Sequence, residues 1–282
     1  MNRWQFAFGR RWISYLVLAL VFAAACIGLS RWQVSRLDEA RTANRLIDSN
    51  FHATPVSLES ALPSLNSYSA EQQWKQVTAS GRYLVENSIL VRNRPMNGQP
   101  GFEMLSPLQL DDGRVFVVDR GYLPTGSAQD RPDSIPAPPS GPVTVTARLQ
   151  AGEPRLAGRN DTARELATIN LPDVQQRIGK ATFTGAYGLL VSETPAASIR
   201  PVASKEPQLD EGLHISYAIQ WVIFAIMGLF GLWYAMRQEY RMRNADDPQE
   251  QLRTERKARK QKAKTPTDSD IEDSILETTT RR

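Results

Sequence analysis

Few residues in this chain could bind a metal or act as a general base. The 282 residues include two histidines, His52 and His214, and one cysteine, Cys26. A structural zinc site uses about four Cys and His ligands, so these three residues cannot form one. The sequence contains no G-x-S-x-G, Walker or G-x-G-x-x-G motif, and spacing singles out no pair of carboxylates. We therefore expect that the protein is not an enzyme.

His214 stands at the start of a long apolar segment. A helix beginning there would carry on one face His214, Tyr217, Ala218, Trp221, Ala225 and Gly228. The small residues would leave a shallow groove beside two aromatic rings, and a neutral imidazole can donate a lone pair to haem iron. The same face also suits packing against a second membrane helix. The residues alone favour packing, because a histidine at a membrane interface needs no ligand.

Two uncharged segments, residues 12–30 and 213–236, are long enough to cross a membrane. As helices they would span about 28 Å and about 36 Å, against a hydrocarbon core of about 30 Å. The alternative for the first segment is a cleaved signal peptide with a processing site near Cys26. The apolar run continues past Cys26, and Ala23 stands where a lipoprotein signal normally has Leu, which both favour a membrane helix.

Basic residues flank both segments. Three arginines precede the first segment and ten Lys or Arg residues lie at positions 237–264, whereas residues 31–212 carry 19 basic and 20 acidic residues. This bias predicts that residues 1–11 and 237–282 are cytoplasmic and that residues 31–212 form an extracytoplasmic domain. The positive charge therefore lies next to the membrane, and we expect the lipid bilayer as its partner and no binding to nucleic acid.

The segment between the two spans is rich in short β-strands. Residues 31–50 predict a helix that continues the first span, and alternating apolar strands with turn residues follow from Trp74 onward. A proline-rich connector interrupts the strands at residues 131–142, and one short helix is expected at residues 171–179. These features predict an α+β membrane protein, with two transmembrane helices flanking a small antiparallel barrel or sandwich. We expect the basic tail, residues 237–282, to be largely disordered.

Three stretches resemble the Surfeit-locus-one family of cytochrome c oxidase assembly proteins. They are "RWQVSR" after the first span, "HISYAIQW" at the second, and the central "SGRYLVENSILVRNRPMNGQPGFEMLSPLQLDDGRVFVVDRGYLP". The resemblance covers about residues 28–221. It places in the outer domain Gly81, Pro107 and the pair Arg120 and Gly121. One departure is Ser30, where the family commonly has Gly.

The resemblance implies a function and a cofactor. Members of this family have two membrane spans and help to assemble haem-copper cytochrome c oxidase, and bacterial members bind haem a. It implies that His214 is the haem iron ligand, and that the neighbouring cofactor-binding residues are Trp32, Gln33, Arg36, Tyr217 and Trp221. The implied partners are the catalytic oxidase subunit and haem a synthase. With 11 residues before the first span, too few for a mitochondrial presequence, we expect a bacterial plasma membrane. The alternative is a cofactor-free scaffold for oxidase intermediates.

Overall fold

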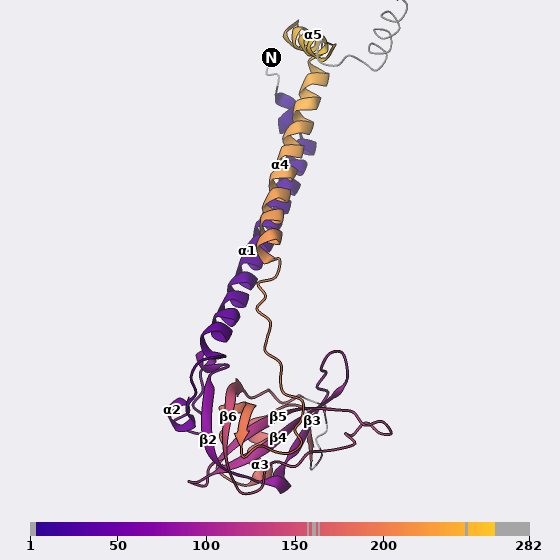
Figure 1. The fold of residues 1–282 in the computed structure, drawn as a ribbon. Coiled ribbons are helices and arrows are strands. Elements are labelled where there is room, and N and C mark those ends of the chain that lie inside the picture. Colours follow the sequence, from indigo (N-terminus) through magenta and orange to yellow (C-terminus); the bar gives the residue numbers. More distant parts are fainter. Residues whose placement is uncertain (1–3, 157, 160–161, 163, 246–247, 263–282) are drawn as a thin grey trace, which may run out of the picture. The chain divides into compact units, whose positions relative to one another are not determined.

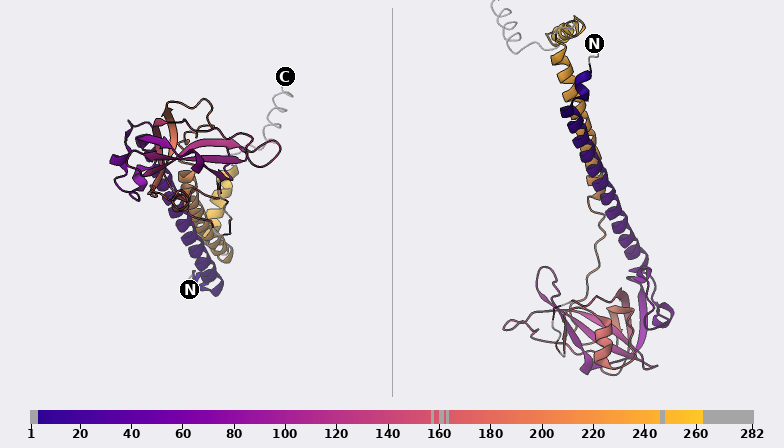
Figure 2. Two further views of the ribbon diagram at one scale, coloured as in Figure 1. Left: turned by 90° about the horizontal axis from the view of Figure 1, so that it is seen from below. Right: turned by 180° about the vertical axis from the view of Figure 1, so that it is seen from behind.

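The computed structural model describes residues 4–156, 158–159, 162, 164–245 and 248–262. The chain divides into two compact units. One comprises Met1–Leu37 together with Leu213–Arg282, and the other comprises Asp38–Gly212. The first unit contains the apolar parts of the two long helices and the second is rich in β-strands, as predicted (Figures 1 and 2).

Among the described residues, two helices are long and apolar enough to cross a membrane, α1 (Arg10–Asn50) and α4 (His214–Arg243). A short 3-10 helix, η1 (Gln5–Phe8), precedes α1. α1 continues unbroken past its apolar part to Asn50, which confirms the predicted extension over residues 31–50. The domain boundary predicted at residue 31 differs from the observed one, because the second unit begins at Asp38 within α1.

The tail is more helical than predicted. α4 continues to Arg243, and a further helix, α5, covers Pro248–Lys262, so the expectation of disorder is wrong for these residues. Helix-favouring Gln, Glu, Arg, Lys and Ala dominate α5, and it contains no Gly and no Pro after its first residue. The rest of the expected disordered tail, residues 263–282, lies outside the described residues.

α1 and α4 pack side by side in opposite directions (Figures 1 and 2). Arg11 forms an ion pair with Glu239 at one end, and a Cβ added at Gly228 would lie 3.1 Å from the ring of Phe22 further along. Next to this contact, a small cluster between the two helices buries Ala23, Cys26 and Ala225, and Trp221 and Phe224 pack against it. Small residues therefore allow the close approach of the two helices.

The outer domain is a closed barrel of five strands. These are β2 (Gln76–Tyr83), β6 (Pro142–Ala151), β8 (Ala186–Thr194), β5 (Val115–Pro124) and β4 (Gly101–Leu110), in that spatial order, and β4 pairs again with β2. Short strands β1 (Val56–Ser57), β3 (Ile89–Arg92) and β7 (Glu165–Leu166) extend the sheet.

The barrel is not entirely antiparallel, because β5 and β8 run parallel. Strand directions around a closed ring of five cannot alternate throughout, so at least one neighbouring pair must be parallel. The sequence predicted an antiparallel barrel or sandwich. A fully antiparallel sheet can form a sandwich or a closed barrel with an even number of strands, but it cannot form a closed barrel of five. The short pairs β1 with β2 and β3 with β7 are also parallel.

Local sequence explains the turns and the barrel closure. Gly113 has φ +88° in the turn that joins β4 to β5. Helix α3 (Leu171–Ile178) begins where Asn170 accepts a hydrogen bond from the backbone N of Asp173, and ends at Gly179 with φ +68°, as predicted. In β2, a Cβ at Gly81 would lie 2.1 Å from the carbonyl oxygen of Gln109, so only glycine allows β2 to approach β4 there.

The remaining helices are short, and the core lies inside the barrel. They are α2 (Leu58–Ala61) and the 3-10 helices η2 (Ala70–Gln72) and η3 (Val85–Asn87). Buried side chains from all five barrel strands, including Val77, Leu108, Phe116, Leu149 and Ala186, meet Phe183 in one cluster. A second cluster joins α3 to the sheet. The barrel therefore has a packed interior rather than a ligand cavity.

Candidate functional site

His214 is the first residue of α4, and its ring contacts α1. Nδ1 of His214 lies 2.9 Å from Oε1 of Gln33. An amide oxygen only accepts hydrogen bonds, so Nδ1 carries the proton and donates it. In a neutral imidazole with this hydrogen bond, the lone pair is on the other ring nitrogen, Nε2, which has no hydrogen-bond partner among the described residues. Both side chains are half-buried, so the pair lies at the surface of the two helices.

This pair has the chemistry of a metal ligand with its supporting residue. A histidine that binds a metal through one nitrogen usually donates its other N–H to an oxygen acceptor, which fixes the tautomer and the ring orientation. Gln33 supplies that acceptor. The residues therefore fit an axial ligand of haem iron. In the described part of the chain, no three His, Cys, Asp or Glu side chains are grouped to hold a bare metal ion.

The structure brings only some of the other predicted site residues to this pair. Trp32 is 57% exposed and Tyr217 is 47% exposed, and both lie within four residues of the pair along their helices. Arg36 is also exposed. Trp221 lies about one helical turn beyond Tyr217, half-buried against the cluster of Cys26 and Ala225, with its ring centroid 5.8 Å from that of Phe224.

The face of α4 expected to form a groove is largely occupied by α1. Ala218 and Ala225 are buried, and Ser30 donates a hydrogen bond from Oγ to the carbonyl oxygen of Ala218 at 3.0 Å. The small residues therefore serve helix packing, which was the alternative interpretation. No open groove for a flat ligand runs along this face. Ser30 stands where the family commonly has Gly, yet the helices still meet there because the hydroxyl bonds to the facing backbone.

A model of the SURF1 family matches residues 20–226 of the chain. This range includes most of α1 with Gln33, the first part of α4 with His214, and the whole barrel. The chain belongs to the SURF1 family. The resemblance seen in the sequence is thus confirmed.

Individual relatives agree with this assignment to the SURF1 family. Uncharacterized SURF1-like proteins of Mycobacterium tuberculosis and Mycobacterium bovis are 32% identical over 252 residues, which is 87% of this chain and 91% of each relative. A SURF1-like protein of Dictyostelium discoideum is 26% identical over 114 residues, 37% of this chain and 41% of the relative. The cytochrome oxidase assembly protein SHY1 of Saccharomyces cerevisiae is 26% identical over 126 residues, 43% of this chain and 31% of the relative.

In this SURF1-family chain, the motif residue Arg120 belongs to the interior of the barrel. Its guanidinium forms an ion pair with Glu193 at 3.1 Å, and both side chains are 0% exposed. Tyr83 donates to the other oxygen of Glu193 at 3.1 Å, and Arg120 also donates to the carbonyl oxygen of Pro136 at 3.1 Å. Arg120 therefore joins three strands and the proline-rich connector. Sequence reasoning missed these partners, although an arginine within the buried run "VFVVDRGYL" indicated that a carboxylate must lie nearby.

The neighbouring Gly121 permits a close backbone contact. It has φ +124°, and a Cβ there would lie 2.3 Å from the carbonyl oxygen of Val202. Tyr122 and Val202 exchange two backbone hydrogen bonds of 2.8 and 2.9 Å. The segment that follows β8 is thereby fixed along β5, so both residues of the Arg120 and Gly121 motif are structural.

A second buried acid, Asp119, lies beside this motif. One oxygen accepts a hydrogen bond from the backbone N of Gly121 at 2.9 Å, and the other has no partner among the described residues. Burial, followed by the negative charge of Glu103, raises the pKa of Asp119 to about 8. Arg94, which pairs with Glu103 at 3.0 Å, opposes this change only partly. Asp119 is therefore an acid that the barrel holds close to its neutral form.

Proposed function

We propose that this chain binds haem a through His214 and supports the assembly of cytochrome c oxidase by delivering haem to the catalytic subunit. The assembly role is supported by membership of the SURF1 family and by the name of the yeast relative, a cytochrome oxidase assembly protein. The hydrogen bond from His214 to Gln33 carries the haem part of the proposal. Haem a supplies an iron centre that accepts a nitrogen lone pair.

Each residue at the end of the helix pair has a defined part in this proposal. Nε2 of His214 would hold the iron, and Gln33 would hold the ring in the required tautomer. Trp32 and Tyr217 are exposed aromatic side chains that could cover an apolar macrocycle from two helices. Arg36 is an exposed cation that could pair with a carboxylate of the ligand. Trp221 would support the site from below, because α1 already covers part of its ring.

An absorption spectrum tests the haem proposal directly. The full chain, purified in detergent from cells that make haem a, should show the absorption of bound haem a. Gln33→Leu removes the acceptor for Nδ1 and keeps the apolar volume, so it should weaken haem affinity by about 10–100-fold, as loss of a supporting residue does at metal sites. Wild-type haem content in Gln33→Leu would show that Gln33 does not support haem binding.

A cofactor-free scaffold is the second candidate, and one observation favours it. The small residues of α4 are used for packing against α1, which leaves no groove along that face. Deletion of the gene tests both candidates, since each predicts that oxidase activity is lost while haem a is still made. Haem-free wild-type protein from such cells would favour the scaffold. Absence of haem a from the deletion strain would contradict both.

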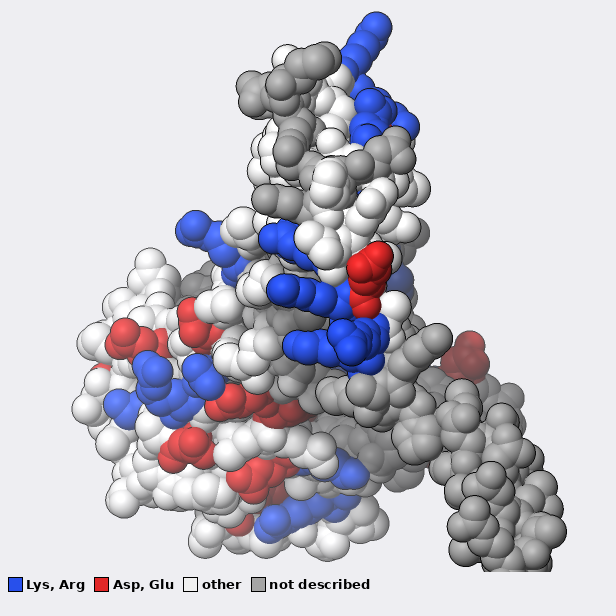
Figure 3. All heavy atoms as spheres, turned by 90° about the horizontal axis from the view of Figure 1, so that it is seen from above, with Lys and Arg blue, Asp and Glu red and all other residues white. Residues whose placement is uncertain are grey.

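We also propose a bacterial plasma membrane as the location, with both ends of the chain cytoplasmic and haem a synthase as a further partner. The basic residues at the free ends of α1 and α4 support this orientation. They include Arg11 and, in the last turn of α4, Arg241 and Arg243. Figure 3 shows mainly Lys and Arg side chains over the helices from this end, whereas Asp and Glu lie largely on the β-rich unit.

Cysteine labelling tests the orientation. Ala128 and Ala258 are exposed, the first between β5 and the connector and the second in α5. In a Cys26→Ala background, Ala128→Cys should react with an impermeant thiol reagent in intact cells, and Ala258→Cys should react only after lysis. The reverse pattern would contradict the orientation.

A further inference from the structure

A small pocket on the β-rich unit is lined by none of the residues assigned to haem. It has a volume of about 270 Å³ and is bounded by η3, the beginning of β3, Met104 of β4 and the proline-rich connector. This volume lies below the range of about 300–1,000 Å³ that is usual for sites of drug-sized ligands. The pocket therefore suits a group of the size of one amino-acid residue.

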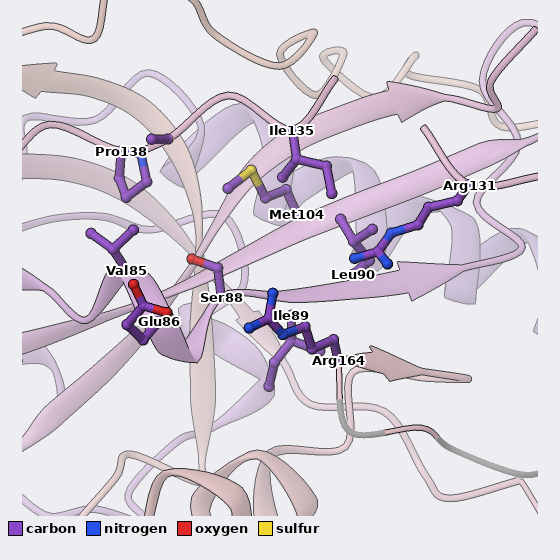
Figure 4. A pocket seen from close by; sticks show the side chains of 11 residues that line it. Val85, Glu86, Ser88, Ile89, Leu90, Met104, Arg131, Ile135, Pro138 and Arg164 are labelled. Atoms are coloured by element: carbon purple, nitrogen blue, oxygen red, sulfur yellow. The ribbon is translucent and has the colours of Figure 1, made fainter. Parts of the chain in front are cut away.

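Two arginines give this pocket its charge. Arg131 from the connector and Arg164 from the segment before β7 line the pocket, and Glu86 is the single acidic residue among the described residues of its lining. Figure 4 shows both guanidinium groups turned into the pocket. Neither has a hydrogen-bond or ion-pair partner within the part of the chain that the structure describes. Two unpaired guanidinium groups opposite one carboxylate leave a net positive charge, which favours an anion, and a carboxylate above all.

The other side of the pocket is apolar. Leu90 and Met104 are buried, and Ile135 lies over them on the connector side (Figure 4). Oγ of Ser88 is buried without a hydrogen-bond partner, and Figure 4 shows it between Arg164 and Val85. A buried hydroxyl without a partner is costly, so a ligand that hydrogen-bonds to it would gain affinity.

The walls of the pocket are fixed by the fold. Pro132 and Pro138 of the connector are buried, and the carbonyl oxygen of Pro136 accepts a hydrogen bond from the buried Arg120. On the opposite side, the backbone N of Leu90 donates to the carbonyl oxygen of Arg164 at 3.0 Å. The pocket therefore exists before any ligand binds, which lowers the entropic cost of binding.

We infer that this pocket binds the C-terminal residue of a partner polypeptide, with an apolar side chain such as that of leucine. A C-terminal residue carries a carboxylate and an apolar side chain on the same Cα, so one residue could reach both the arginines and the apolar floor. An internal acidic residue could not do so as well, because neighbouring side chains of an extended peptide point to opposite sides. The backbone N–H of the terminal residue could donate to Oγ of Ser88.

N-acetyl-leucine is the minimal probe for this pocket, and N-acetyl-leucinamide is its neutral control. The experiment uses the full chain in lipid nanodiscs at low ionic strength, with ¹³C-labelled methionine methyl groups. Met104 is the methionine that lines the pocket, and its signal is assigned by its loss in Met104→Leu. We expect a saturable shift of this signal with N-acetyl-leucine and at least about tenfold weaker binding of the amide, because the amide lacks the charge. No saturable shift, or equal affinity for acid and amide, would overturn the inference.

Matched variants identify the arginines. Arg131→Gln combined with Arg164→Gln should weaken binding of N-acetyl-leucine at least tenfold and remove the preference for the acid over the amide. Arg82→Gln removes an exposed arginine outside the pocket lining and should leave the affinity unchanged. An equal loss in Arg82→Gln would indicate unspecific attraction to positive charge and would overturn the assignment.

A longer probe distinguishes a peptide end from a free small acid. Acetyl-Gly-Gly-Gly-Gly-Leu should shift the Met104 signal with at least the affinity of N-acetyl-leucine. If the single residue binds and the peptide does not, the pocket admits only free acids and the partner part of the inference is wrong. None of these measurements uses haem, so their outcome is independent of the proposed role of His214.

Discussion

Two polar pairs hold elements together in the two units of this chain, and they differ in what they leave exposed. Arg120 and Glu193 are both fully buried in the barrel, and their charges are directed toward each other, Tyr83 and the connector. Gln33 and His214 are half-buried on the helix pair, and Nε2 of the histidine points to no protein partner among the described residues. The first pair serves folding, whereas the second leaves a lone pair for a ligand. Membership of a family motif therefore does not by itself indicate a binding role.

The largest expected effect comes from breaking the buried pair. Arg120→Met would leave the carboxylate of Glu193 buried without its main cation, which should lower the free energy of unfolding by about 3–5 kcal/mol. Arg200, whose Nε lies 4.0 Å from Glu193, is partly exposed and can offset only part of this loss. Denaturant unfolding of the full chain, followed by circular dichroism, measures the change.

The matched control removes both charges. Arg120→Met with Glu193→Leu should cost less than Arg120→Met alone, because no isolated charge stays in the barrel. If the single variant lost less than about 1 kcal/mol, the pair would not be a structural element of the barrel.

Two glycine variants, one in each unit, test where the fold has no room for a side chain. Gly81→Ala places a methyl group against the backbone of Gln109, so it should cost about 1–3 kcal/mol or prevent barrel closure. Gly28→Ala in α1 meets no atom within 4 Å and should cost nothing measurable. Thermal unfolding of both variants provides the test. Similar losses of stability in the two variants would show that the close approach of β2 to β4 does not require glycine at position 81.

Asp119 predicts a pH dependence of the barrel. Its pKa is raised to about 8, above the ordinary value of 3.8, first by burial and then by Glu103. The folded state therefore holds a proton that the unfolded state has already released between about pH 4 and pH 8, so this residue makes stability fall as pH rises through that window. The charged groups that face it are Glu103, Arg94 and Glu153, and Tyr187 lies nearby on β8.

Asp119→Asn keeps the hydrogen-bond acceptor for Gly121 and removes the ionisation. The variant should be more stable than wild type at pH 8, with a difference that shrinks toward pH 5. Unfolding midpoints measured across this range would show it. A wild-type chain that gained stability with rising pH through the same window, relative to the variant, would contradict the assignment.

The smallest effect is expected in the helix pair. Ser30→Ala removes the hydrogen bond to the carbonyl oxygen of Ala218, and such bonds between membrane helices contribute about 0.6 kcal/mol. The buried thiol of Cys26 should then react about threefold faster with a membrane-permeant reagent, since tenfold corresponds to 1.4 kcal/mol. Ser14→Ala, which removes a bond to Arg10 within α1, should leave the rate unchanged. Equal rates for both variants would show that Ser30 does not hold the helices together.

The helices and strands could be predicted from the sequence better than the way in which the strands close into a barrel. Periodicity and turn residues located both long helices, the main strands and α3, because these depend on neighbours along the chain. The parallel contact of β5 with β8 and the ion pair of Arg120 with Glu193 were missed, because each joins residues at least 70 positions apart. At the site, the residues alone singled out His214 and favoured packing for it, and the resemblance to the family added Gln33. That they bond to each other, and that α1 fills the groove, follows only from the packing of the two helices.

The most direct test of the account is the haem a content of His214→Ala, measured by absorption of the full chain purified from cells that make haem a. His52→Ala is the matched control, because His52 belongs to the β-rich unit, where it is exposed and contacts Glu206. We expect His214→Ala to be folded and inserted in the membrane but to lose most of its haem absorption, whereas His52→Ala should keep it. Wild-type haem content and full oxidase activity in His214→Ala would contradict the assignment and leave the histidine as a packing residue.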